Sequence, residues 1–386
     1  MKKHIHIICV SGTRADYGIY RPLLLELNDH PNFHLSIIGT GMHLLNEYGK
    51  TIHEIQKDTL NVIATPNILL KGDTTNAMSQ AIGLGILYFS DIFQTHQPDY
   101  VLLLGDRGEM LAAAIAAHYQ NINIIHLHGG EKSGSADDAV RHVISQLSHI
   151  HFVSSYQSKE RLLKLVEKKE NIYVVGSLRK SEIKKMNQLT EMQITETISK
   201  FSINQNKKLI VTLFHPDSKS NKSINDQINC LLDALAVFND EQVLIIGANS
   251  DAGGNTFNHK LLDFSSKNEF VTFEYSLPQD EFLLILKKAD VLVGNSSSGI
   301  IESPFFGVPV VNIGTRQEGR EKAKNVIDVP FNQEQIITAI KQSLKNKNYQ
   351  IKNNPYDTFE NPEKKIIEII EKINNTKEDE VNYDYE

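Results

Sequence analysis

Several features that would assign this chain of 386 residues to a broad class are scarce in its sequence. It has two cysteines, Cys9 and Cys230, in apolar runs of different halves, and we expect reduced, buried thiols of a cytoplasmic protein rather than a disulfide. No stretch approaches the ~18 consecutive apolar residues of a membrane span, so no membrane partner is expected. A formal net charge of −7 argues against a nucleic-acid surface and leaves any anionic ligand to a local cluster of arginines.

Common cofactor motifs are missing as well. The segment 11–18, which follows the first apolar run, lacks the G-x-G-x-x-G fingerprint of dinucleotide sites. Histidines occur close together at His126 and His128, but they would point to opposite faces of a continuing strand. We therefore expect no metal site.

What the sequence does contain is an alternation of short, β-rich apolar runs with helical patterns, which predicts parallel sheets covered by helices. The expected strands are 5–10, 35–39, 62–64, 100–104, 122–126, 152–154, 172–175, 208–214, 242–246, 270–273, 291–293 and 308–313. Helical patterns include 109–119, 139–147 and 363–374.

We predict an α/β protein with two Rossmann-like, doubly wound domains, 1–178 and 179–358, facing each other across a cleft. A terminal helix and an acidic, disordered tail would occupy 359–386. In such a protein the strand C-terminal ends, and therefore the ligand, would lie in the cleft.

The segment 290–320 predicts a site for a phosphate-bearing ligand. An apolar run ends in the small-residue loop 294–299, and the start of a short helix follows. Free backbone N–H groups and the helix dipole favour an anion at such a turn. Glu302 can accept hydrogen bonds from sugar hydroxyls, while Arg316 and Arg320 can neutralise a diphosphate. The candidates are Ser296, Ser297, Ser298, Glu302, Arg316 and Arg320, which indicate a nucleotide but no reaction.

Two groups at expected strand ends in the first half carry ionisable side chains. Arg14 follows the first strand, where it either lies at the mouth of the sheet or is an ordinary surface arginine. Asp106 follows the strand 100–104, with Glu109 three residues later. That spacing is typical of a capping box, although a carboxylate at a strand end is also well placed for acid–base chemistry.

The richest group lies within 126–142, next to glycines. Its members include His126, His128, Glu131, Asp137 and Asp138. Ionisable groups crowded in this way have the displaced, coupled pKa values that general acid–base catalysis needs. Asp137 is the leading carboxylate, ahead of Asp138 and Glu131. Part of the group also has a structural interpretation, since Ser135 and Asp138 fit a capping box.

Two further candidates come from the second half. His215 ends the run 208–214, where it is either structural or a partner for a substrate phosphate or a proton. Asn249, in the polar loop 247–254, is a substrate-binding candidate.

Taken in order, these motifs resemble the UDP-N-acetylglucosamine 2-epimerase family, specifically its hydrolysing branch from bacterial sialic-acid synthesis. The matching segments are 12–18, 39–43, 105–107, 128–131, 137–142, 214–216, 294–302 and 314–320. The resemblance implies the two-domain fold of GT-B glycosyltransferases, a UDP-sugar substrate, no cofactor, and a homodimer or homotetramer. It implies UDP binding by Arg14, His215, Ser296, Ser297, Glu302 and Arg316, and a chemical role for Asp106 and Asp137.

One position departs from the family pattern. Some hydrolysing members carry a glutamate, thought catalytic, where this chain has His128. Either His128 takes the acid–base role, or Glu131 or Asp138 substitutes.

The reaction implied by the resemblance is removal of the C2 proton as UDP leaves C1, and then hydration of a 2-acetamidoglucal to N-acetylmannosamine. The alternatives are UDP-N,N′-diacetylbacillosamine as substrate, a GT-B glycosyltransferase and a UDP-sugar sensor.

Overall fold

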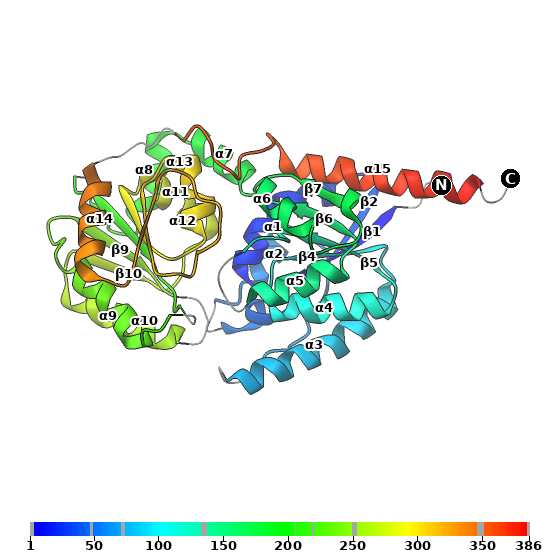
Figure 1. The fold of residues 1–386 in the computed structure, drawn as a ribbon, viewed down its shortest axis with the longest axis horizontal. Helices are drawn as coiled ribbons and strands as arrows, with labels where there is room; N and C mark the ends of the chain where they lie inside the picture. Colours follow the sequence, from blue (N-terminus) through cyan, green and yellow to red (C-terminus); the bar gives the residue numbers. More distant parts are fainter. Residues whose placement is uncertain are drawn as a thin grey trace. The chain divides into compact units, whose positions relative to one another are not determined.

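Two all-parallel sheets organise the chain, each in its own compact unit (Figure 1). The computed structural model describes residues 4–46, 49–70, 74–132, 137–204, 206–217, 220–248, 253–345 and 351–383, without side chains after residue 376. The first unit comprises Met1–Glu131, Ala139–Ser181 and Thr358–Glu386. The second comprises Lys132–Asp138 and Glu182–Asp357.

The first unit contains a seven-stranded sheet in the order β3-β2-β1-β4-β5-β6-β7. Its strands are β1 Ile5–Ser11, β2 Phe33–Gly39, β3 Val62–Ala64, β4 Tyr100–Leu104, β5 Asn123–Leu127, β6 Ile150–Val153 and β7 Ile172–Val174. The central strands are apolar at nearly every position because helices cover both faces of the sheet.

The helices of the first unit connect successive strands. They are α1 Arg14–Asp29, α2 Ile52–Lys57, α3 Thr75–His96, α4 Gly108–Tyr119, α5 Asp137–Leu147 and α6 Tyr156–Leu162, with the short 3-10 turns η1 Gly41–Leu44 and η3 Lys169–Asn171. The next helix, α7 Lys180–Gln188, belongs mainly to the second unit. Two of the boundaries between the units fall in the first turns of α5 and α7.

The second unit repeats the same winding with six strands in the order β10-β9-β8-β11-β12-β13. The strands are β8 Leu209–Leu213, β9 Gln242–Ile246, β10 Val271–Glu274, β11 Val291–Gly294, β12 Val310–Ile313 and β13 Val326–Val329. The helices are α8 Glu191–Ser199, α9 Ile224–Leu235, α10 Gly254–Lys267, α11 Gln279–Lys288, α12 Ser298–Ile301, α13 Ser303–Phe306 and α14 Gln333–Lys345.

The last helix, α15 Pro362–Tyr383, returns to the first unit. It buries Ile366, Ile367 and Ile370 in the core that also contains Tyr20 and Leu24 of α1. The expectation that this helix ends at 374 was wrong, because it continues through most of the acidic stretch expected to be disordered.

All twelve expected strands are present, within two residues at each end. The sequence did not predict β13, a four-residue strand at the edge of its sheet that contains Asp328. Cys9 is fully buried and Cys230 half-buried, and both are free thiols. None of the described helices combines the length and apolar character needed to cross a bilayer.

The strand order reverses between β1 and β4 in the first sheet and between β8 and β11 in the second. Loops at the strand C-terminal ends diverge at such a point, so polar side chains and ligands can collect there. Most of the candidate residues follow β1, β4, β5, β8, β11 and β12.

Candidate active site

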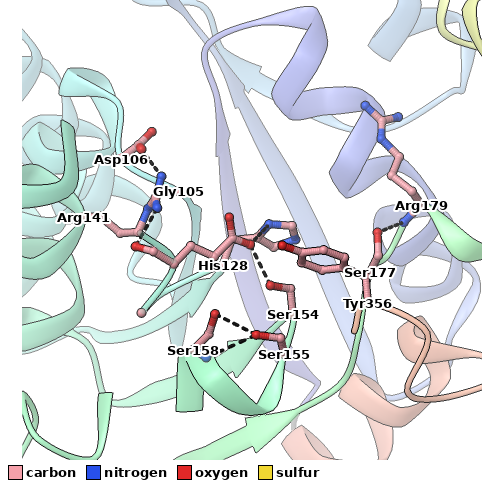
Figure 2. Close-up of polar contacts among 12 residues, drawn as sticks. Gly105, Asp106, His128, Arg141, Ser154, Ser155, Ser158, Ser177, Arg179 and Tyr356 are labelled. Carbon is pink, nitrogen blue, oxygen red and sulfur yellow. Dashed lines mark hydrogen bonds and ion pairs between the residues drawn. The ribbon is translucent and has the colours of Figure 1, made fainter. Parts of the chain in front are cut away.

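Asp106 and Arg141 form the first polar contact of the site (Figure 2). Asp106 follows β4 and Gly105, and its Oδ2 accepts a hydrogen bond from Nη2 of Arg141 on α5. The Arg141 side chain is 4% exposed and the Asp106 side chain is 21% exposed. The predicted capping role of Asp106 is wrong, because the N-cap of α4 is Arg107 and no side chain caps it. The Asp106 carboxylate is instead held at the strand end by a buried cation.

His128, Glu131 and Ser154 form the second contact. His128 Nδ1 lies 2.9 Å from Glu131 Oε1, and the same oxygen accepts a hydrogen bond of 2.7 Å from the Ser154 hydroxyl. All three side chains are buried. An ionised carboxylate can only accept, so Nδ1 carries a proton, and in the neutral tautomer with that proton Nε2 has the free lone pair. Nε2 is buried and has no hydrogen-bond partner among the residues that the structure describes, so it can be the acceptor that a general base needs.

Arg141 joins the two contacts. Besides binding Asp106, it donates from Nη1 to the backbone carbonyl of Glu131 at 2.8 Å. His128 itself has φ +61°, a left-handed conformation that is uncommon for a residue with a side chain. Its backbone N–H donates to the carbonyl of Phe152 at 3.0 Å, which fixes this turn after β5. One guanidinium therefore holds the carboxylate and the histidine loop in one arrangement.

His126 has a structural role, in contrast to His128. It is fully buried, with Nε2 2.8 Å from the carbonyl of Gly105 and Nδ1 3.1 Å from the hydroxyl of Ser145. Burial lowers its pKa to about 3, so the ring is neutral near pH 7. With both nitrogens occupied, His126 fixes the loop that carries Asp106.

Glu109 and Asp16 are two buried acidic residues that lie near each other beside the loop after β1. Glu109 Oε1 accepts from Arg107 Nε at 2.6 Å. A Cβ at position 12 would lie 2.0 Å from that oxygen, so any residue other than Gly12 would require the Glu109 carboxylate to move. Asp16 is 7% exposed, and burial raises its pKa to about 6, while Arg107 opposes the shift and Glu109 adds to it. Glu109 is thus part of the site wall rather than of a capping box.

In the second unit, Asn295 joins three strand-end loops. Its side-chain oxygen accepts from the backbone N–H of His215, and its amide nitrogen donates to the His215 carbonyl, both at 2.8 Å. Its own carbonyl accepts from Gln317 Nε2 at 2.9 Å and from Arg316 Nη1 at 3.3 Å. The loops after β8, β11 and β12 are therefore locked together around a residue that is 1% exposed.

The serine loop after β11 differs in part from its prediction. Gly294 has φ +145°, and a Cβ there would lie 2.1 Å from the carbonyl of Leu213. Ser296, Ser297 and Ser298 are half-buried, but the following helix is the single turn α12. A helix this short has only a small dipole. Any anion here would rely on individual N–H and hydroxyl groups.

Asp217 supports the third loop of this unit. Its Oδ2 accepts from both the backbone N–H and the hydroxyl of Thr315, each at 2.9 Å. Asp217 is 3% exposed, and its backbone is bonded to the buried Gln227. These bonds therefore hold the start of the turn that carries Arg316 in one position.

The structure brings the predicted residues together in two sets. Asp106, His128 and Glu131 share partners in the first unit. His215, Arg316 and the serine loop share Asn295 in the second. The buried Glu302 follows α12, and the half-buried Arg320 ends the turn after β12.

The remaining candidates lie outside these two sets. Arg14 begins α1 and is half-buried. Asp137 is exposed at the start of α5, one turn before Arg141. Asn249 and Ser135 lie outside the described residues.

Sequence reasoning missed the residues that hold these sets in place. They are Arg141, Ser154, Asp16, Asn295 and Asp217. Four of them lie close in sequence to a predicted residue, and Ser154 ends the expected strand 152–154, so proximity to a strand end was the available signal. Nothing in a single sequence says which polar side chain turns inward.

Comparison with known proteins links this arrangement to one family. Residues 25–371 match the family described as UDP-N-acetylglucosamine 2-epimerase. The chain is 40% identical over 338 residues to the UDP-N,N′-diacetylbacillosamine 2-epimerase (hydrolyzing) of Legionella pneumophila, covering 88% of each protein. It is 35% identical over 361 residues to the polysialic acid biosynthesis protein P7 of Escherichia coli, covering 92% of this chain and 90% of that protein.

The fold also has counterparts among solved structures. A UDP-GlcNAc 2-epimerase from Neisseria meningitidis bound to UDP-GlcNAc superimposes with a TM-score of 0.81 at 21% identity, covering 95% of this chain and all of that one. The predicted GT-B-like α/β fold with two parallel sheets is confirmed.

Proposed function

Because the chain belongs to the UDP-N-acetylglucosamine 2-epimerase family and groups with its hydrolysing members, we propose that it converts UDP-N-acetylglucosamine and water to N-acetylmannosamine and UDP. The observation that carries the proposal is the cluster of His128, Glu131, Arg141 and Asp106. It supplies an oriented base and a fixed carboxylate at adjacent strand ends.

A second candidate substrate is UDP-N,N′-diacetylbacillosamine. The observation that favours it is the 40% identity to the Legionella enzyme of that name. The two sugars share the 2-acetamido group and the UDP leaving group and differ at C4 and C6, so the same cluster serves either.

The first proposed step is elimination. His128 Nε2 takes the proton from C2, the electron pair forms the C1–C2 double bond, and the C1–O bond breaks so that UDP leaves. Glu131 stabilises the imidazolium that forms, as does any carboxylate that orients a catalytic histidine through a hydrogen bond. Arg14, Arg316 and Arg320 are proposed to stabilise the charge that develops on the diphosphate.

The second step adds water to the 2-acetamidoglucal. Inversion at C2 requires a proton delivered to the face opposite the one it left, so a second group is needed. We assign delivery of that proton to Asp137. Asp106, held by Arg141, takes the proton of the water whose oxygen bonds to C1. His128 and Asp106 then lose their protons to solvent and Asp137 regains one, so the overall change is substrate plus water to free sugar plus UDP.

The second unit is proposed to hold the UDP. Ser296, Ser297 and Ser298 would contact the diphosphate with Arg316 and Arg320 as counter-charges, Glu302 would accept from the ribose hydroxyls, and His215 and Asn249 would complete the site. Support comes from the way Asn295 gathers the loops after β8, β11 and β12.

Replacing Asn295 with alanine is expected to lower the free energy of unfolding by about 2–4 kcal/mol, because the buried backbone groups of His215 lose their partners. It should also weaken UDP binding by the folded protein about tenfold or more. Urea unfolding and titration calorimetry measure the two effects.

The matched control is Asn325→Ala. Asn325 is also 1% exposed and donates to the carbonyl of Val308 at 2.7 Å. It precedes β13, however, and so lies at the N-terminal ends of the strands, whereas Asn295 follows the C-terminal end of β11. It should lose comparable stability with unchanged UDP affinity. Equal UDP affinity in both variants would remove Asn295 from the proposed UDP site.

The proposed function is tested by comparing kcat/KM for the two UDP-sugars, with products separated by chromatography and no acceptor present. We expect UDP and a free 2-epimeric sugar in equal amounts. UDP-N-acetylmannosamine as the product would assign the non-hydrolysing reaction. Turnover only when an acceptor is added would assign a glycosyltransferase. A higher kcat/KM for the bacillosamine sugar would select the second candidate.

A further inference from the structure

The first unit contains a cavity of about 680 Å³ at the end of its sheet where β4 and β5 begin. Its wall combines the end of α3, the start of β4 at Tyr100, the turn 120–123 between α4 and β5, and Asn374 of α15. The candidate active-site residues of this unit follow the opposite ends of the same strands. The proposed reaction therefore makes no use of this cavity.

The wall of the cavity is polar and almost uncharged. Half of the twelve described residues that line it are amides, although only 50 of the 386 residues of the chain are Asn or Gln. Asp99 is the one charged residue among the twelve, and its Oδ2 already accepts from the backbone N–H of His6 at 2.9 Å. The amides are Gln94, Gln97, Gln120, Asn121, Asn123 and Asn374. Since polar surface normally carries many charged side chains, this composition favours a neutral ligand.

The backbone of Gln97 is a second, independent observation. Gln97 ends α3 in the left-handed conformation, with φ +44°, and its N–H donates to the carbonyl of Phe93 at 2.8 Å. Glycine, and after it asparagine, are the usual residues at such a helix end, because a Cβ makes this conformation unfavourable. Glutamine here lowers stability, and strain of this kind is typical of functional positions.

Three neighbouring residues are placed to contact a ligand. Gln120 donates from Nε2 to the carbonyl of Ser90 at 2.8 Å, which fixes the plane of its amide. Asn123 is half-buried at the start of β5. Tyr119 is 82% exposed, so its ring presents a flat apolar face with a hydroxyl at one end. Amides of this kind can bond to sugar hydroxyls while an aromatic ring packs against the C–H groups of the sugar.

The same wall excludes other classes of ligand. It includes no lysine or arginine in the described part of the chain, and α3 and α4 both end here, so their dipoles disfavour a phosphate or carboxylate. A metal ion would need several carboxylates or imidazoles, and the described residues contain no such group. A side-chain amide offers a donor and an acceptor side by side, as a sugar hydroxyl requires.

We propose that this cavity is a sugar site, separate from the candidate active site, that binds a neutral hexose. The amides would bond to its hydroxyl groups, with Gln97 and Gln120 as the central contacts, and Tyr119 would pack against the ring. A volume of about 680 Å³ lies within the usual range for small-molecule sites.

The test titrates the full chain with N-acetylglucosamine and follows binding by saturation-transfer NMR. We expect saturable binding at millimolar concentration. Glucuronate has a similar ring with a carboxylate, and it should bind at least tenfold more weakly. The proposal would be overturned if N-acetylglucosamine showed no saturable binding, or if glucuronate bound equally well.

The variant Gln97→Gly separates binding from folding. Glycine removes the amide and also relieves the left-handed backbone, so this variant should unfold at a higher temperature than the natural chain and yet bind N-acetylglucosamine at least tenfold more weakly. Its turnover of the UDP-sugar should be unchanged. Ser202→Gly is the matched control, because Ser202 in the second unit is also left-handed, with φ +54°. That variant should gain thermal stability and keep its sugar affinity.

A second pair of variants examines the ring. Tyr119→Ala should weaken the binding of N-acetylglucosamine at least fivefold, whereas Tyr275→Ala, which removes a ring that is 64% exposed in the second unit, should not. Natural affinity for the sugar in both Gln97→Gly and Tyr119→Ala would show that the sugar binds elsewhere and would overturn the proposal.

Discussion

Replacing His128 by glutamine is expected to lower kcat by about 10²–10⁴-fold, the usual contribution of a general base. Glutamine can keep the hydrogen bond to Glu131 but cannot take a proton from carbon. The affinity for UDP should stay within a few-fold of the natural protein, because His128 belongs to the first unit's cluster. Steady-state kinetics and titration calorimetry with UDP provide the two measurements.

Two variants sharpen this result. His118→Gln changes an exposed histidine on α4 and should leave kcat unaltered. Glu131→Gln should lower kcat less than His128→Gln does and should shift the pH–kcat profile, because the orienting carboxylate no longer stabilises the imidazolium. Near-normal turnover of His128→Gln would transfer the base role to Glu131 or Asp138.

The second large effect is expected from Asp106→Asn. The side chains have the same shape, but the amide cannot accept a proton from water, and the ion pair with Arg141 is lost. We expect kcat to fall about 10²–10⁴-fold with UDP affinity retained. Stopped assays of free sugar and UDP would show both products decreasing together.

Asp58→Asn provides a matched control for that experiment. Asp58 also belongs to the first unit and pairs with an arginine, through contacts of 2.6 and 2.8 Å to Arg21. If the loss of an arginine–carboxylate pair were sufficient to explain the effect, both variants would lose activity equally. Unaltered kcat in Asp58→Asn and a large fall in Asp106→Asn would assign the effect to chemistry.

The fold could be predicted from the sequence because buried parallel strands are read directly from apolar runs. Tyr100–Leu104, for example, is apolar throughout and buried at every position. The same rule does not identify β13, because a strand at the edge of a sheet can carry charged residues and so need not form a continuous apolar run. It also fails for the end of α15, where the charged composition suggested disorder although the helix continues.

The candidate site was predictable as a set of positions and not as a set of contacts. Asp106, His128 and Glu131 were found because strand ends collect functional groups. Their linkage through Arg141 was not, because it depends on where α5 lies relative to β4. Asp106 shows the difference: its spacing to Glu109 fits a capping box, yet tertiary contact with a buried guanidinium determines its role.

The same limit applies to the histidines. His126 and His128 are two residues apart and chemically identical, and the sequence assigns neither a function. Only the contacts distinguish them, because both nitrogens of His126 are bonded whereas Nε2 of His128 has no partner in the described part of the chain.

The central claim is that the enzyme removes the C2 proton of its UDP-sugar and returns a proton from solvent. Proton NMR of the reaction of UDP-N-acetylglucosamine in D2O tests it most directly. Free N-acetylmannosamine with deuterium at C2 is expected from the first turnover, with UDP released in equal amount. A released sugar that keeps its original hydrogen at C2 would contradict it.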